Sequence, residues 1–146
     1  MSRGLETSGR RFEIALSPLT DDTHNALFSC QGVDLLAFVP VAGLGQEFYG
    51  DSSPEKLEGS DVWGWTSPTT GEEYVLMGKT NSTAFFRIVT DADTGLPTLE
   101  NLGELPNPAT EFSVWKDIKV RGNHAYIVAE ASAHGMQVFD LTTLDG

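Results

Sequence analysis

The chain has 146 residues, and its 21 Asp and Glu residues outnumber its nine Lys and Arg residues, which gives a formal net charge of −12. Binding to a phosphate backbone requires clustered Lys and Arg, so the scattered basic residues argue against a nucleic-acid partner and against anionic membranes. Because Cys30 is the single cysteine, the chain can form no internal disulfide, zinc cluster or two-cysteine redox motif. The length is that of one small domain.

The first part of the chain carries few structural signals. Residues 1–29 are polar and form an expected lead-in segment, ahead of a repeat region at 30–146. The apolar run at 33–39 is typical of a strand, and the loop that follows, at 45–59, is long enough to be a candidate functional loop. No signal peptide or anchor is recognisable, and no apolar stretch approaches the ~20 residues that cross a bilayer, so we expect no membrane insertion.

A first repeat at about 60–105 has the pattern of consecutive hairpins. Strands are expected at 61–65, 73–77 and 84–89, where Val, Tyr and Phe favour a pleated surface. Turn signals separate them at Thr66-Ser-Pro-Thr-Thr-Gly71 and Asn81-Ser-Thr83, and the run from Asp91 to Pro97 is expected to close the unit. Helix-period patterning is scarce, so the sequence predicts antiparallel β structure.

A second repeat at about 115–146 has the same pattern with a tighter turn. Strands are expected at 117–120, 125–129 and 136–141, and Arg121-Gly122-Asn123 joins the first two. Tyr126 follows Tyr74 by 52 residues, and Phe139 follows Phe86 by 53. One such unit cannot bury its apolar face alone, which is typical of stacked or radially arranged sheets.

The fold class that follows is all-β: an antiparallel, propeller-like repeat array that is incomplete at about two blades. Such arrays usually need roughly three or more repeats. We therefore expect either that the chain is a fragment of a larger array or that self-association covers its open sheet edges, because unpaired edge strands are templates for pairing.

Several segments resemble the LVIVD-repeat proteins of the choice-of-anchor B family. They are Ser60-Asp-Val-Trp-Gly-Trp65, Gly71-Glu-Glu-Tyr74, Asn81-Ser-Thr-Ala-Phe85, Trp115-Lys-Asp-Ile-Lys-Val120 and, most specifically, Ala129-Glu-Ala-Ser-Ala-His-Gly-Met-Gln-Val-Phe-Asp-Leu141. The resemblance covers about residues 30–144. It implies a β-propeller-like array in a protein exported to the cell surface or beyond, attached through varied C-terminal anchors and without an established catalytic activity.

Acidic residues supply the candidate metal ligands, with calcium as the candidate ion. Asp91 and Asp93 precede a glycine as in a calcium loop, although Gly95 and Leu102 stand where further ligands belong, and a surface turn is the favoured interpretation. Asp61 and Asp117 occupy matching positions in the two repeats. Each is either a structural link that accepts hydrogen bonds from the backbone N–H groups of the next blade, or part of a carboxylate ring around a cation.

Other side chains could bind ligands or act in catalysis. Glu130 and His134 lie at a strand end and could bind a metal or act as acid and base, or form a structural hydrogen-bond network. The three tryptophans could stack on sugars or flat ligands, or pack in the core; they are Trp63, Trp65 and Trp115. Asn81-Ser-Thr83 is a glycosylation sequon, which has meaning only for a protein exported in a eukaryote.

These features favour a non-catalytic interaction or scaffold module of an exported β-propeller protein, with a protein or carbohydrate ligand. The sequence has no phosphate-binding loop, nucleophile elbow, HExxH motif or nicotinamide fingerprint. The alternative is part of a propeller enzyme, cation-dependent, that uses Glu130 and His134 with Asp61 or Asp117. Catalysis would require these side chains to converge in one cleft.

Overall fold

The structure is a computed structural model, and it describes residues 37, 39, 58–93, 95–108 and 113–146. By their contacts the residues form two units, Met1–Phe38 and Val39–Gly146, and the second contains every strand of the described residues. The lead-in segment expected at 1–29, Cys30, and nearly all of the strand at 33–39 and the loop at 45–59 lie outside the described residues.

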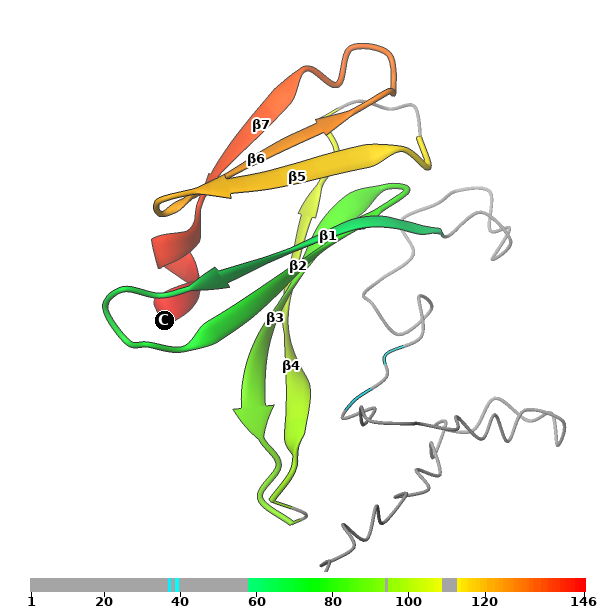
Figure 1. Cartoon of the computed structure of the whole chain (residues 1–146). Helices are drawn as coiled ribbons and strands as arrows, with labels where there is room; N and C mark the ends of the chain where they lie inside the picture. The colour runs from blue at the N-terminus through cyan, green and yellow to red at the C-terminus, as the bar shows by residue number, and fades with distance from the viewer. Residues whose placement is uncertain (1–36, 38, 40–57, 94, 109–112) are drawn as a thin grey trace, which may run out of the picture. The chain divides into compact units, whose positions relative to one another are not determined.

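The first repeat folds into a four-stranded antiparallel sheet in the order β1-β2-β3-β4 (Figure 1). Its strands are β1 (Gly59–Thr66), β2 (Glu73–Lys79), β3 (Ser82–Thr90) and β4 (Pro97–Pro106). Each strand pairs with its neighbour in sequence, so the turns set the register. Trp65 lies opposite Tyr74, and Leu76 lies opposite Phe85.

The second repeat folds into a three-stranded antiparallel sheet in the order β5-β6-β7. Its strands are β5 (Lys116–Arg121), β6 (His124–Ala129) and β7 (Met136–Asp140). The two-residue turn between β5 and β6 contains Gly122 at φ 57°, a left-handed conformation that favours glycine.

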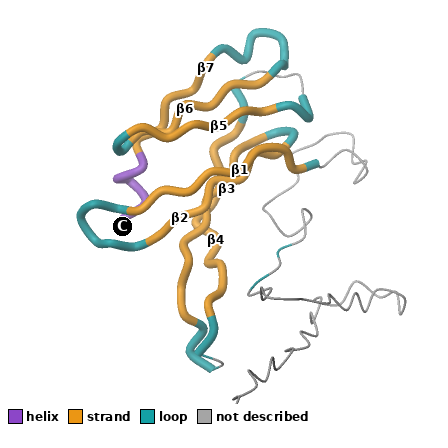
Figure 2. Tube along the Cα trace, viewed as in Figure 1, coloured by secondary structure: helices purple, strands orange, loops and turns teal. Residues whose placement is uncertain are grey.

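A short 3₁₀ helix, η3 (Leu141–Asp145), follows β7 and is drawn in purple in Figure 2. It begins after Asp140, whose carboxylate accepts a hydrogen bond from the Thr142 N–H at 3.0 Å. Its first residue, Leu141, is fully buried and belongs to the core. The sequence pattern extends the last strand into this segment, whereas the structure ends the strand at Asp140.

The strand β4 is missing from the sequence-based expectation, which ends the first unit at a closing turn. Its two terminal residues are prolines, and Pro is a weak strand signal because it cannot donate to a ladder. At the sheet edge this limitation costs little, and β4 is an edge strand. A bulge also interrupts its alternation: Phe85 lies opposite Gly103 but Phe86 lies opposite Asn101.

The main core lies between the two sheets. Alternation along each strand turns one set of side chains toward the other sheet. The buried residues of this core are Trp65, Tyr74, Leu76, Phe85, Ile118, Ala125, Ile127 and Leu141. Two ring contacts show how closely the sheets and strands pack: Phe85 stacks on Phe139 across the interface with centroids 4.6 Å apart, and Trp65 lies 5.1 Å from Tyr74.

The opposite face of the first sheet, which we call the back face, is also covered. Its buried residues are Ala84 and Phe86, and Val39, Val75, Met77 and Leu99 pack against them. Val39, which precedes the first repeat, contributes to this cover. Both faces of the first sheet therefore exclude water around its central strands.

The expected fold class is confirmed: the described residues form an all-β structure of two antiparallel sheets that do not close, consistent with an incomplete propeller-like arrangement. In the part of the chain that the structure describes, no helix has the length and apolar character needed to cross a membrane.

Candidate functional site

Asp61 links the two sheets. Its Oδ2 accepts a hydrogen bond from the N–H of Ile118 in β5 at 2.8 Å, and its Oδ1 accepts one from the N–H of Val62 at 2.9 Å. β5 is the edge strand of its sheet, so the Ile118 N–H would otherwise have no ladder partner. The interpretation of Asp61 as a structural link between repeats agrees with these contacts.

A lysine joins both repeat aspartates. Lys119 Nζ contacts the Asp117 carboxylate and lies 3.5 Å from Asp61 Oδ2 and 4.6 Å from the centroid of the Trp63 ring. Burial by itself raises the pKa of the Asp61 carboxyl. The hydrogen bonds that this carboxyl receives and the charge of Lys119 outweigh burial, so the pKa lies below its ordinary value. The hydrogen bond to Asp117 raises the pKa of Lys119.

Asp117 does not repeat the role of Asp61 within this chain. Its side chain is 60% exposed, and the contact that the structure records for its carboxylate within the second sheet is to Lys119. In the strand register Asp117 lies opposite Val128, as Trp63 lies opposite Leu76. The two aspartates, expected at matching positions of the repeats, therefore differ in register position as well as in surroundings.

The three tryptophans have different environments. Trp115 is 65% exposed and Trp63 is 38% exposed, whereas Trp65 is 7% exposed and packs in the main core. Stacking of a ligand on Trp65 is therefore ruled out in this fold, and the core alternative holds for that residue. The two exposed rings stay available to a flat ligand.

An apolar surface covers the side of the second sheet that faces away from the first. Ile118, Ala125 and Ile127 point into the core, so alternation turns the residues between them outward. We call this surface the outer face; it is formed by Tyr126, Val128, Met136 and Val138. Val128, Met136 and Val138 are 40%, 60% and 53% exposed. Their strand partners are one another: Val128 lies opposite Met136, and Tyr126 opposite Val138.

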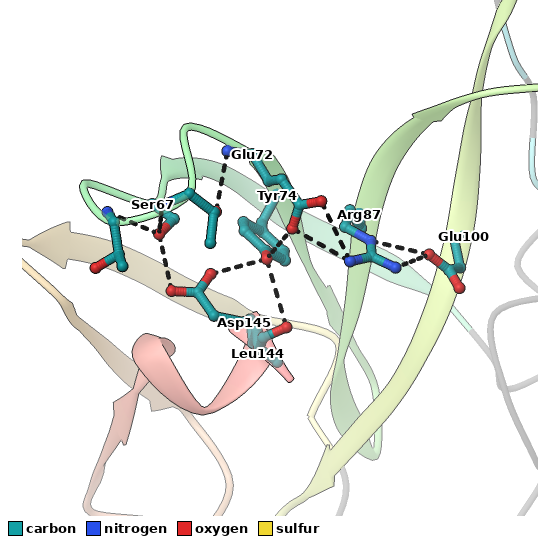
Figure 3. A network of polar contacts seen from close by, with 9 residues as sticks. Ser67, Glu72, Tyr74, Arg87, Glu100, Leu144 and Asp145 are labelled. Atoms are coloured by element: carbon teal, nitrogen blue, oxygen red, sulfur yellow. Dashed lines mark hydrogen bonds and ion pairs between the residues drawn. The ribbon is translucent and has the colours of Figure 1, made fainter.

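A polar network fastens η3 to the first sheet, as Figure 3 shows. Asp145 accepts hydrogen bonds from the hydroxyls of Ser67 at 2.8 Å and Tyr74 at 2.9 Å. The Tyr74 hydroxyl also lies 3.0 Å from Glu72, which pairs with Arg87 at 3.2 Å. Burial, followed by the two neighbouring carboxylates, raises the pKa of Tyr74 to about 12. The network is structural, because Ser67 and Tyr74 use their hydroxyls to hold η3 and Glu72 is paired with Arg87 within the first sheet.

A second polar cluster is buried near the turn between β2 and β3. Lys79 Nζ pairs with Glu104 Oε2 at 2.7 Å, and the Ser82 hydroxyl donates to the same oxygen at 2.5 Å. Lys116, only 6% exposed, donates from Nζ to the Ser82 carbonyl at 3.0 Å and to the side-chain oxygen of Asn107. Burial, and then the charge of Lys79, lower the pKa of Lys116 to about 8.

This cluster has one property of a functional site, because depressed lysine pKa values are frequent where lysines act as nucleophiles. Lys116, however, lies between the sheets among main-chain and amide oxygens that use its protons. We interpret it as a structural group that joins β5 to the β2–β3 turn. Sequence reasoning missed it, although its position two residues before the inward-facing Ile118 places Lys116 on the buried face.

Glu130 and His134 do not form a pair. Glu130 is exposed, and its N–H donates to the Trp115 carbonyl at 3.3 Å. His134 is buried in the turn before β7, where Nδ1 lies 3.0 Å from the Gly135 carbonyl and Nε2 has no hydrogen-bond partner among the described residues. The expected change from strand to loop is present, and no recorded contact joins the two side chains for acid–base work.

Asp91 stabilises the turn in which it lies. Its N–H donates to the Leu96 carbonyl, its carbonyl accepts from the Gly95 N–H, and its Oδ1 accepts from the Asp93 N–H at 3.2 Å. Asp93 is exposed. Side-chain capping of this kind is what Asp does in tight turns. The turn interpretation therefore accounts for these residues.

The glycosylation sequon lies in a buried turn. Asn81 is buried, its side-chain oxygen lies 3.0 Å from the Ser82 hydroxyl oxygen, and its carbonyl accepts from the Asn107 N–H. Thr83 is fully buried. A glycan on Asn81 would have to displace this packing, so the folded chain does not offer the sequon as an acceptor.

A calcium site remains a prediction of the sequence. Among the described residues, no group of three or more His, Cys, Asp or Glu side chains is placed to hold a metal ion. Asp61 and Asp117 do lie close together, but Lys119 supplies the positive charge between them.

Comparison of the chain with models of protein families, with curated proteins and with solved structures finds no match.

Proposed function

We propose that the chain is a non-catalytic interaction module of a β-propeller-like repeat protein of the LVIVD type, and that its outer face is the contact surface. The observation that carries the proposal is the exposure of Val128, Met136 and Val138 side by side on one sheet. A contiguous exposed apolar patch marks an interaction site far more often than scattered apolar residues do.

The polar surroundings of the outer face support the same function. Asp117, Lys119 and Arg121 alternate along the outward side of β5, and His124 and Asp140 lie opposite each other at the end of the sheet that holds Arg121. A charged rim around an apolar centre is the usual anatomy of a protein interface. Such a rim keeps the chain in solution and orients a partner.

Export to the cell surface or beyond, and membership of the choice-of-anchor B family, are part of this proposal and rest on the sequence resemblance. The acidic composition is compatible with that setting. Trp115, which precedes β5, adds an exposed aromatic side chain at which a protein or carbohydrate ligand can be anchored.

Sedimentation of the purified chain over a range of concentrations tests the proposal. We expect association that grows with concentration and that Val138→Lys abolishes, because a charge at the centre of the outer face opposes its burial. Ile88→Lys is the matched control, since Ile88 is a similarly exposed apolar residue on the first sheet. Association that Val138→Lys leaves unchanged, or that Ile88→Lys weakens equally, would refute the outer face as the contact surface.

A further inference from the structure

The structure describes two of the chain's three methionines and places them in opposite surroundings. Met136 is the first residue of β7, and it is 60% exposed on the outer face. Met77 lies in β2, an interior strand of the first sheet, and packs against Ala84 and Phe86 on the back face. Because a thioether must be reached by an oxidant before it can react, the fold exposes Met136 to oxidation and shields Met77.

Met136 belongs to the apolar centre of the outer face. It lies opposite Val128 of β6, and Val138 follows two residues later on the same side of β7. The side chains of the two valines cannot donate a hydrogen bond. Asp117, which lies opposite Val128 on β5, carries only acceptor oxygens when it is ionised. A polar oxygen added to the Met136 sulfur would therefore receive no hydrogen bond from these neighbours.

The chemistry that adds such an oxygen is the two-electron oxidation of a thioether by a peroxide. A sulfur lone pair attacks one peroxide oxygen, a sulfur–oxygen bond forms as the oxygen–oxygen bond breaks, and hydrogen peroxide is reduced to water. The step is reversible through a reductase, whose two thiols become a disulfide while the oxygen leaves as water. Water hydrates the sulfoxide of an exposed side chain in the free protein. A partner that covers the sulfoxide removes this hydration.

We propose that Met136 is a reversible oxidation site, and that its oxidation by a peroxide weakens the binding of a partner to the outer face. This inference rests on the proposed function, since it requires a partner on that face. Docking on the sulfoxide desolvates a polar oxygen without a hydrogen bond in exchange, which lowers affinity about tenfold. The fold itself is unaffected, because Met136 contributes its side chain to the surface and not to the core.

The first test is the selectivity of oxidation in the full chain, with Cys30→Ser in every sample so that no thiol competes for the oxidant. Peptide mapping by mass spectrometry follows both methionines during treatment with dilute hydrogen peroxide. Met136 should be oxidised about tenfold faster than Met77, and the chain oxidised at Met136 should keep its melting temperature. Equal rates for the two methionines, or a melting temperature that falls as Met136 is oxidised, would overturn the proposal.

The second test measures binding. Oxidation should raise the concentration at which the chain associates in sedimentation about tenfold, and it should shorten retention on a phenyl resin, which reads the apolar surface even of a monomer. Met136→Leu keeps an apolar side chain of similar volume, so peroxide should change neither property of this variant. Met136→Gln should reproduce both changes without oxidant. Unchanged association and retention after complete oxidation of Met136, or the same peroxide response in Met136→Leu, would refute the site.

The proposed function and the oxidation site fail in different ways. If Val138→Lys abolishes association and oxidation of Met136 does not, the outer face remains the contact surface and the oxidation site is refuted. If neither change affects association, both proposals are refuted.

Discussion

Lys116 makes the stability of this fold depend on pH in a predictable window. Its ammonium group is 6% exposed and donates to two neutral oxygens, and burial lowers its pKa to about 8. In the unfolded chain the same amine keeps its ordinary pKa of about 10.4. Between these values the unfolded state binds more protons than the folded state, so the free energy of unfolding rises with pH.

The size of the effect follows from the shift. One pKa unit corresponds to about 1.4 kcal/mol, so the folded state gains up to about 3 kcal/mol as the pH rises from below 8 to above 10. Lys116→Met removes the buried charge and with it this gain. It also leaves the Ser82 and Asn107 oxygens without a donor, at a cost of about 1–3 kcal/mol, so the two effects nearly offset each other at neutral pH.

Urea unfolding between pH 7 and pH 9.5, followed by tryptophan fluorescence, measures the prediction, because the buried Trp65 reports on the core. The wild-type midpoint should rise across this range, and that of Lys116→Met should stay level. Lys119→Met is the control, since its amine is exposed and should leave the wild-type rise intact. Parallel profiles for wild type and Lys116→Met would refute the assignment of a buried, destabilising ammonium.

Three further outcomes are expected. Asp61→Asn should cost about 1–2 kcal/mol in urea unfolding because it weakens the link to β5, whereas the exposed Asp117 should change stability by less than about 0.5 kcal/mol on the same substitution; equal costs would contradict the link. The melting temperature of the wild-type chain should fall between pH 10 and 12, because Tyr74 ionises near pH 10 in the unfolded chain but keeps its proton to about 12 in the folded one, and Tyr74→Phe should abolish this fall. A wild-type melting temperature that stays level over this range would contradict the raised pKa. Gly78→Ala should cost about 1–3 kcal/mol, since a Cβ would lie 3.2 Å from two side chains, and Gly64→Ala, with its nearest contact at 3.7 Å, should cost less.

The sequence was sufficient for the repeat and for most strands because those depend on local pattern. The 52-residue step from Tyr74 to Tyr126 corresponds to side chains that point the same way along the array, and the Gly122-Asn123 turn lies where its residue types predict. β4 could not be predicted in this way. Its prolines and its bulge at Gly103 break the alternation, and only its place at the sheet edge makes them acceptable.

The functional assignments of single residues depended on contacts far apart in the sequence. Asp61 meets Ile118 after 57 residues, and Lys116 meets Ser82 after 34. Neither partner can be identified from spacing, because the packing of one sheet on the other decides which backbone groups need an acceptor. The same limit applies to Trp63 and Trp65, which are two residues apart on one strand and differ in exposure because the second sheet covers only one of them fully.

The two sheets differ in how far their outward-facing sides are buried. The back face of the first sheet is buried and the outer face of the second is exposed, while one aspartate of the repeat bonds the next sheet and the other carries an exposed carboxylate. Val138 is thus a surface residue in the isolated chain and becomes an interface residue when a partner binds the outer face. Val138→Lys should leave the isolated chain folded, because the side chain is 53% exposed, whereas in a complex it places an unpaired charge in an interface, where burial costs several kcal/mol. An unchanged melting temperature together with a loss of association therefore separates an effect on the interface from an effect on the fold.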